Sequence, residues 1–546
     1  SSLYGPTSWH INPEFFSSQL YELFPHLDTV DKQLKLVVGL LHLMGKVVGL
    51  DVIPHVDRFA EHSLANPSYF EWIRRVQDQI VAHHSTLHED VERMLFEHLK
   101  IVGDAVGQTS LPDKPDTFFN DWPEQKRLEF MFGWPYDYHG RLERRKAMVD
   151  LLFQAGLETL PATMGPPYRG IEVDPDPKAV NIDDQGRIWR DYRIIEPQKF
   201  SRVFGPLARY KLYEPFNENR DWQLNFEAPV RQVWAYVSSH YNSIVEAFDF
   251  DFMRGDMSHV QMRPEGVPTT TGTYYDLLAE VKMRILEKRP YFGYFAESFL
   301  APPGEMAYGD ECDHLEASLA DTSLGDLQSE PVGTEQFVKE FARYNNLLTY
   351  RRFAPNFTLM TADKDDPRFD AYYLNGNETR YFIGLFLCDM PSYMSLGFEC
   401  RDQHLTPAPN EHYTKLYVFQ ESKGPKATKG PWIWGKNLQL YEQLNRMKAI
   451  SNDIHEVIQS SDTQWLLPPD SSGVSKVIAW TQKLEQRFIF AANLSQSSME
   501  EINLELTLNE WKCVFSTHFS EPNLRFEGQA SGRLEAGECL IWMRIS

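Results

Sequence analysis

Apolar positions along the chain follow first a helical period and then an unbroken run, and this succession is repeated. Residues 29–46 carry apolar side chains at helical spacing, and the β-branched run 47–53 follows and stops at Pro54. A helix followed by a buried strand is typical of a parallel sheet. The same succession recurs as helix then strand in 230–247 and 248–253, and in 274–288 and 291–296. Units of this size favour a (β/α)8 barrel or an open doubly wound sheet.

The later part of the chain changes character near Asn452. Before it lie a strand-like run, an apolar segment and a helical pattern, at 357–361, 381–387 and 438–450. After it come short strand-like runs separated by polar turns: 477–480, 487–493, 502–506, 512–516 and 535–545. Short strands with this spacing predict a C-terminal β-sandwich domain.

About 170 residues after the first helix–strand unit lack this rhythm. They contain a polar helical stretch, 84–106, and connectors rich in Pro and Asp, such as 172–178. A segment of this length is too long for a loop and predicts an inserted subdomain. The expected α/β architecture is a (β/α)8 TIM barrel with an insertion after strand 3 and a C-terminal sandwich. Its parts are the barrel at 1–56 and 229–451, the inserted subdomain B at 57–228 and the sandwich at 452–546.

Charge and cysteine content narrow the class of function. The chain has 54 basic and 77 acidic residues, a net charge of −23, which argues against nucleic acid or an anionic membrane as the partner. Five widely spaced cysteines without a CxxC pair indicate no zinc site and a reducing compartment, so we expect a cytoplasmic protein. No long apolar run or leader is visible, so we expect no membrane span. The oligomeric state stays open.

Four short segments carry the candidate chemistry, each with an acid at or near the end of an apolar run: 51–55, 252–259, 294–298 and 363–368. Three of the acids are Asp256, Glu297 and Asp365. The carboxyl ends of parallel barrel strands share one face, where such enzymes place their sites. Cleaving a glycosidic bond with retention needs a carboxylate that attacks the sugar and a carboxylic acid about 5–5.5 Å away that protonates the leaving oxygen.

The residues around two of these acids suit this chemistry. Asp256 must be ionised to attack, and Arg254, two residues earlier on the same strand face, is expected to keep it so. Glu297 must start protonated, and the flanking Phe295 and Phe299 are expected to raise its pKa.

In order and spacing these segments resemble glycoside hydrolase family 13, the α-amylase superfamily. Residues 3–15 resemble its second barrel strand, 51–55 its first conserved region, Arg254-Gly-Asp256 its strand-four motif and 387–399 its strand-eight segment. The resemblance implies an oligosaccharide or α-glucoside substrate, with Asp256 as nucleophile, Glu297 as acid/base and Asp365 as transition-state stabiliser. The implied sugar-binding residues are Tyr4, Trp9, Asp51, His55, Arg254, His259, Lys364 and Arg368.

Each of these residues also has a purely structural interpretation. Asp51 can be a strand-end cap or an ion pair to Arg58, and His55 can be a packed loop histidine. Arg368 can form a salt bridge to Asp365 or Asp366. Tyr4 and Trp9 can stack on sugar or close the barrel.

The chain departs from the family pattern around the acids. The usual Asn-His pair reads His55-Val56, and Lys364 replaces the histidine before the third acid. His259 follows Asp256 by three residues, and this spacing resembles the branch of the family that transfers maltosyl groups from maltose 1-phosphate. With such a donor Lys364 can hold the phosphate; otherwise it replaces a contact to a sugar hydroxyl. The Asn that supports calcium in many relatives is missing here, and we expect no metal and no cofactor.

The residues before Asp51 leave room only for the second strand and second helix of the family's barrel. No segment of the sequence therefore corresponds to the first strand and first helix. We expect these elements upstream of Ser1; the alternative is an incomplete barrel with an exposed strand edge. The expected function is a retaining α-glucan- or α-glucoside-active hydrolase or transglycosylase. Alternatives are a maltosyltransferase with a phosphorylated donor and a non-catalytic, amylase-like binding or scaffold protein. An α/β hydrolase is disfavoured because no Gly-x-Ser-x-Gly motif occurs.

Overall fold

A computed structural model shows the chain as two compact units. The first comprises Ser1–Glu297 with Pro302–Ala320, and the second Ser298–Ala301 with Asp321–Ser546. Within them the structure describes residues 5–160, 169–183, 185–196, 202–203, 207–216, 223–301, 309–325, 327, 330–358, 376–393, 438–518 and 525–545. The three-domain division expected from the sequence stays a prediction.

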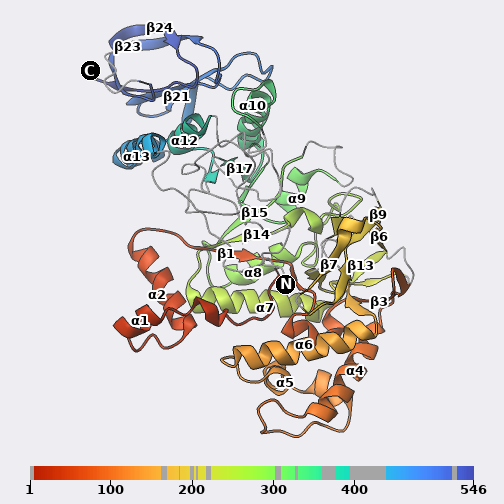
Figure 1. Cartoon of the computed structure of the whole chain (residues 1–546). Coiled ribbons are helices and arrows are strands. Elements are labelled where there is room, and N and C mark those ends of the chain that lie inside the picture. Colours follow the sequence, from red (N-terminus) through yellow and green to blue (C-terminus); the bar gives the residue numbers. More distant parts are fainter. Residues whose placement is uncertain are drawn as a thin grey trace. The chain divides into compact units, whose positions relative to one another are not determined.

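A parallel sheet lies at the centre of the first unit (Figure 1). Strand β14 (Phe252–Gly255) pairs in parallel with β1 (Gly49–Val52) on one side and with β15 (Gly293–Ala296) on the other. Helix α2 (Val30–Leu43) precedes β1, α7 (Arg231–Phe248) precedes β14 and α8 (Leu277–Leu286) precedes β15. Helix α7 packs against both other helices. The predicted helix–strand units are therefore confirmed, whereas a closed eight-stranded barrel stays a prediction.

The boundary between α7 and β14 differs from the predicted one. The helix continues through Phe248 and ends at Asp249, which caps it in the left-handed conformation with φ 62°. The strand consequently begins at Phe252 and not at residue 248. Apolar Phe248 and Phe250 are buried around this cap, which explains why their run looked like a strand.

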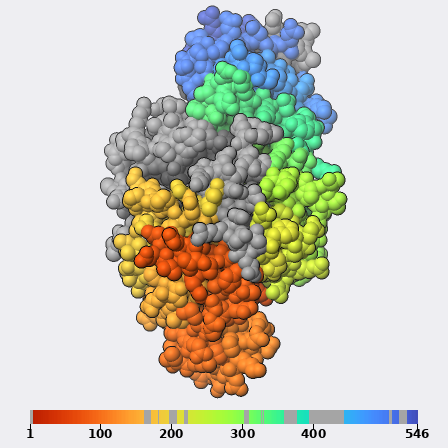
Figure 2. All heavy atoms as spheres, turned by 90° about the vertical axis from the view of Figure 1, so that its right-hand side faces the viewer, coloured from red at the N-terminus to blue at the C-terminus, as the bar shows by residue number. Residues whose placement is uncertain are grey.

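The insertion contains a helical lobe and small antiparallel sheets. Helices α4 (Leu87–Val102), α5 (Glu124–Phe132) and α6 (Tyr138–Gln154) pack together and gather in one region of the space-filling view, in orange (Figure 2). Helix α4 confirms the predicted helical stretch. The remaining helices and strands up to α7 are α1 (Ser18–Leu23), β2 (His55–Asp57), α3 (Glu61–Ala65), β3 (Trp72–Val76), β4 (Gln79–Ala82), β5 (Leu157–Thr159), β6 (Arg169–Val173), β7 (Val180–Ile182), β8 (Ile188–Arg190), β9 (Tyr192–Glu196), β10 (Arg202–Val203), β11 (Leu207–Arg209), β12 (Tyr213–Pro215) and β13 (Leu224–Pro229). Helix α9 (Glu311–Ala317) also belongs to the first unit.

The second unit continues the helix-then-strand pattern before its antiparallel sheet. Helix α10 (Glu335–Tyr350) precedes β17 (Ala354–Pro355), which pairs in parallel with β16 (Thr322–Ser323). Helix α12 (Asn377–Phe386) precedes β19 (Ser392–Tyr393), which pairs in parallel with β18 (Phe357–Thr358). The apolar segment 381–387 is thus mostly the end of a helix. Helices α13 (Leu438–Asp453) and α14 (His455–Gln459) follow.

Six C-terminal strands form one antiparallel sheet in the order β20-β21-β22-β25-β23-β24. They are β20 (Thr463–Leu467), β21 (Val477–Gln482), β22 (Phe488–Asn493), β23 (Glu500–Ser516), β24 (Arg525–Leu534) and β25 (Cys539–Arg544). Alternate residues of β21, β22, β23 and β25 build its buried core. The predicted C-terminal strands are confirmed, while their division into two facing sheets stays a prediction. Among the described residues, no helix is both long enough and apolar enough to cross a membrane.

Candidate active site

Asp256 and Glu297 occupy equivalent places at the carboxyl ends of two adjacent parallel strands. The Asp256 N–H donates to the Val52 carbonyl at 3.0 Å, and the Glu297 N–H donates to the Gly255 carbonyl at 2.9 Å. Each acid is therefore the first residue beyond its strand, with its backbone still held by the neighbouring strand. The two carboxyl groups are delivered side by side by the most regular part of the first unit.

Gly255 allows the strands to approach closely just before Asp256. A Cβ atom at this position would lie 2.6 Å from Cε2 of Tyr294 and 2.8 Å from Cδ1 of Leu278. Both distances are too short for real carbon contacts, so any larger residue would displace β14 or its neighbours. The glycine thus fixes where the strand delivers Asp256.

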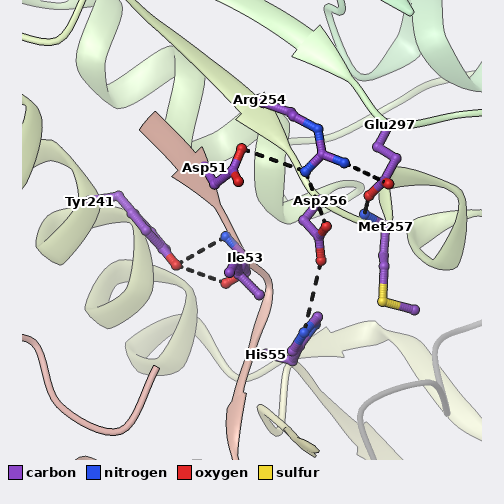
Figure 3. A network of polar contacts seen from close by, with 8 residues as sticks. All are labelled: Asp51, Ile53, His55, Tyr241, Arg254, Asp256, Met257 and Glu297. Carbon is purple, nitrogen blue, oxygen red and sulfur yellow. Dashed lines mark hydrogen bonds and ion pairs between the residues drawn. The ribbon is translucent and has the colours of Figure 1, made fainter. Parts of the chain in front are cut away.

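Arg254 faces three carboxylates at once (Figure 3). Its Nη2 atom lies 2.6 Å from Oε1 of Glu297, and its Nη1 atom lies 3.3 Å from Oδ1 of Asp256 and 3.5 Å from Oδ1 of Asp51. The shortest of these ion pairs joins Arg254 to Glu297. One guanidinium cannot neutralise three carboxylates, so the cluster favours keeping a proton on one of them.

The turn after Asp256 is shaped to hold Glu297. Met257 has φ 49° in the left-handed region, a conformation that costs a non-glycine residue on the order of 1–3 kcal/mol. In this turn the Met257 N–H donates to Oε2 of Glu297 at 2.9 Å, and the Ser258 hydroxyl donates to the Glu297 carbonyl at 2.6 Å. Backbone strain is therefore located where it orients an acid.

The pKa values of this pair are shifted in the directions opposite to those expected from the sequence. Burial and the neighbouring Glu297 raise the pKa of Asp256 well above its usual range. Burial alone would also raise the pKa of Glu297, but Arg254, a hydrogen bond with Asp256 and the Met257 N–H outweigh burial and lower it. The expectation that Arg254 ionises Asp256 and that apolar neighbours protonate Glu297 is thus wrong for the ligand-free protein, because Arg254 and Met257 both favour Glu297.

His55 lies on the other side of Asp256 from Arg254 (Figure 3). Its Nε2 atom is 3.9 Å from Oδ2 of Asp256, and the residue is only 3% exposed. Burial lowers the pKa of His55 to about 4, so its imidazole is neutral near pH 7. The two oxygens of Asp256 therefore meet a cation on one side and a neutral imidazole on the other.

The structure places the other described candidates differently. Asp51 is exposed and belongs to the Arg254 cluster, while Arg58 pairs with Glu158, so the alternative Asp51–Arg58 ion pair is wrong. His259 lies in the short helix Ser258–Gln261, where it helps to lower the pKa of Glu297.

Trp9 is packed by other rings. It stacks on His240 with centroids 4.4 Å apart and on His62 at 5.1 Å, and its Nε1–H donates to the Tyr236 hydroxyl at 2.9 Å. These contacts match the alternative in which Trp9 serves packing. Tyr4, Lys364, Asp365 and Arg368 lie outside the described residues, and so does the segment 394–399.

Two residues of this region, Tyr241 and Met257, were not predicted from the sequence. The Tyr241 hydroxyl contacts both backbone polar groups of Ile53, and Met257 adopts the strained turn described above. Tyr241 lies on the apolar side of a helix, where an aromatic residue indicates packing. The only sequence signal for the Tyr241 contact was Pro54. It ends the strand, so the backbone N–H and carbonyl of Ile53 need other hydrogen-bond partners. Among the described residues, no group of three or more His, Cys, Asp or Glu side chains is arranged to hold a metal ion.

Comparisons with known proteins give weak matches of one kind. No family model matches the chain, and no curated protein matches it either. The matching solved structures include an α-amylase from Geobacillus thermoleovorans complexed with acarbose (12% identity, 60% of this chain, 66% of that one, TM-score 0.40). Others are an α-amylase from Malbranchea cinnamomea (11%, 63% of each chain, 0.37) and the trehalulose synthase MutB (12%, 74% of this chain, 86% of that one, 0.41).

The alignment covers just under two thirds of the length of either amylase. TM-scores this low establish no shared fold.

Proposed function

We propose that this protein is a retaining enzyme acting on α-glucosides, with Asp256 as nucleophile and Glu297 as general acid/base. The observation that carries the proposal is that these two carboxyls lie at adjacent strand ends on one guanidinium, with Nη2 of Arg254 2.6 Å from Glu297 and Nη1 3.3 Å from Asp256. Retaining glycosidases hold their carboxyls about 5–5.5 Å apart, whereas inverting enzymes leave about 6.5–9.5 Å for a water molecule. Two carboxyls that contact the same guanidinium fit the shorter spacing of the retaining arrangement.

The proposed reaction begins with one proton shared by the pair. A sugar hydroxyl that donates to Asp256 stabilises its ionised form, and the proton passes to Glu297. Asp256 then attacks the anomeric carbon while the glycosidic oxygen leaves with the proton from Glu297. Water or an acceptor hydroxyl next gives its proton to Glu297 and attacks the same carbon, which releases Asp256. Each proton and electron pair is thereby accounted for.

The outer parts of the proposal follow the sequence motifs. Asp365 completes the acids as the residue that distorts the sugar ring, and Lys364 and Arg368 flank it. A closed barrel, an oligosaccharide substrate and sugar contacts from Asp51, His55 and His259 belong to the same proposal. We propose no metal and no cofactor. The choice of acceptor separates hydrolysis from transfer.

A binding protein is the second candidate, and one observation favours it. Arg254 makes its shortest contact with Glu297 and lowers its pKa, as a purely structural ion pair would. A protein of this kind would bind α-glucans without turnover. Substrate binding must therefore move the proton for the enzyme proposal to hold.

Product analysis tests these candidates. The protein is incubated with maltooligosaccharides, sucrose, trehalose and maltose 1-phosphate, with and without an acceptor sugar, and the variants Asp256→Asn and Glu297→Gln are run beside it. Glu124→Gln, which alters a half-buried carboxylate outside the cluster, is the control. The proposal predicts turnover that both site variants lose and the control keeps. Equal turnover by the parent and Asp256→Asn would overturn it, and binding without turnover would support the binding protein.

A further inference from the structure

The backbone leaves the parallel sheet at Ile53. The preceding residue, Val52, still pairs with β14 and accepts the N–H of Asp256. Pro54, the following residue, has no N–H to donate. Both polar backbone groups of Ile53 therefore need a partner other than the sheet.

One side chain supplies that partner (Figure 3). The hydroxyl of Tyr241 accepts the Ile53 N–H at 3.1 Å and donates to the Ile53 carbonyl at 2.9 Å. Tyr241 is only 4% exposed and lies on α7, the helix that leads into β14. The helix–strand unit that positions Asp256 thus also forms hydrogen bonds to the chain where it leaves β1.

Two residues further on, the chain reaches His55. Its backbone pairs with Arg209 in the antiparallel contact between β2 and β11. The strand pairing fixes the chain beyond the turn, and Tyr241 fixes it before the turn. The position of the imidazole beside Oδ2 of Asp256 follows from these two anchors.

We propose that Tyr241 is a positioning residue that holds His55 against Asp256; this inference rests on the function proposed above. The tether acts through the hydroxyl and not through the ring, because the ring packs edge-on against Trp9 whether or not the hydroxyl is present. Without the hydroxyl, Ile53 loses both of its partners and the turn at Pro54 is free to relax. His55 then leaves the place where its neutral imidazole can donate a hydrogen bond to ionised Asp256.

Tyr241→Phe tests the tether, and Tyr236→Phe is a matched control. Tyr236 lies on the same helix, is equally engaged in two hydrogen bonds through its hydroxyl, and has neither of them with Ile53. We expect Tyr241→Phe to lower kcat on the order of tenfold with a smaller change in KM, because small displacements of reacting groups cost rate more than binding. The control should leave both constants nearly unchanged.

A double-mutant cycle shows whether the effect passes through His55. If Tyr241 acts through the imidazole, Tyr241→Phe adds almost nothing once His55→Ala is present. Independent effects that multiply would overturn the proposal.

The imidazole itself gives a readout that needs no turnover. NMR of histidine-labelled protein, with the His55 signal assigned from the His55→Gln spectrum, reports its pKa. We expect the value near 4 in the parent and in Tyr236→Phe, and a rise toward 6.5 in Tyr241→Phe as the ring becomes hydrated. Asp256 and Glu297 are the charged groups that face this ring, and both are unchanged in these variants.

The two proposals fail in different ways. An unmoved His55 pKa in Tyr241→Phe overturns the tether whatever the activity. A moved pKa in a protein that turns over no α-glucoside supports the tether and removes the proposed function.

Discussion

Two partly buried polar clusters of the first unit each combine carboxylates with a histidine, and helix α7 supplies residues of one of them. The support cluster comprises Trp9, Asn66, Glu124, Tyr236 and His240. In it a single carboxylate, Glu124, receives the Tyr236 hydroxyl at 2.5 Å, the Asn66 amide at 2.7 Å and faces Nε2 of His240 at 3.3 Å.

The site cluster comprises Asp51, His55, Arg254, Asp256 and Glu297. Here three carboxylates share one guanidinium, so acids exceed the groups that stabilise their charge. The pKa values differ accordingly. Burial would raise the pKa of Glu124, but its donors outweigh burial and lower it, whereas burial and Glu297 raise the pKa of Asp256. A buried polar cluster indicates chemistry when its charges are unbalanced, since only then is a proton free to move.

Asp256→Asn should break the site cluster with the largest effect on activity. We expect turnover of any cleaved α-glucoside to fall at least about 10³-fold, because no nucleophile remains. The variant should also be more stable than the parent at neutral pH. Folding raises the pKa of Asp256, so the parent protein loses stability as pH rises from the unfolded pKa toward the folded pKa. Asn does not titrate, so the variant has no such loss. Initial rates and thermal melts at pH 4 and 7 measure both. Lower stability at pH 7 would contradict the raised pKa.

Glu124→Gln should do the reverse in the support cluster. One charge-assisted acceptor is lost while three buried or half-buried donors stay in place, so we expect a loss on the order of 1–3 kcal/mol in unfolding free energy. The rate per folded molecule should stay near that of the parent. Denaturant unfolding and kcat measure the two effects. A loss of kcat comparable with that of Asp256→Asn would erase the distinction between the clusters.

Gly255→Ala should push β14 against its neighbours and disturb Asp256. The added methyl would contact Tyr294 and Leu278, and overpacking of this kind costs about 1–3 kcal/mol. The control is Gly39→Ala within α2, where no atom lies within 4 Å of the new methyl and Ala favours the helix by about 1 kcal/mol. Opposite shifts in melting temperature are expected for the pair. Equal shifts would show that the approach at Gly255 is not tight.

Asp276→Asn should change stability in a way that depends on pH. Oδ1 of Asp276 caps α8 by accepting the Ala279 N–H at 2.7 Å, and Asn caps equally well. Burial raises the pKa of Asp276 from 3.8 to about 7. The parent therefore loses stability as pH rises from about 4 to about 7, and the variant does not. Melting temperatures should be similar at pH 4 and higher for the variant at pH 8; a gap independent of pH would contradict this.

The sequence predicted the helix–strand units and the acids at their ends, because both depend on local periodicity. Asp256 and Glu297 follow runs whose hydrophobicity identifies them as strands. The C-terminal strands were found for the same reason, although 502–506 and 512–516 belong to one strand whose register shifts between Glu505 and Glu510.

Properties set by distances between separate segments could not be predicted. The position of the shared proton depends on whether Arg254 lies nearer Glu297 or Asp256, and motif spacing does not contain that difference. The Tyr241 tether joins residues 188 positions apart, and a tyrosine on an apolar helix face looks the same whether its hydroxyl is used or not. The ring partners of Trp9 are likewise far along the chain, so motif spacing does not contain them.

Covalent trapping tests the central claim most directly. The protein is incubated with a fluorinated α-glucosyl fluoride, whose slow second step lets a glycosyl-enzyme accumulate, and is then examined by intact-mass and peptide mass spectrometry. We expect one added glycosyl group, attached to Asp256, and none in Asp256→Asn. An unlabelled parent protein, or a label on any other residue, would contradict it.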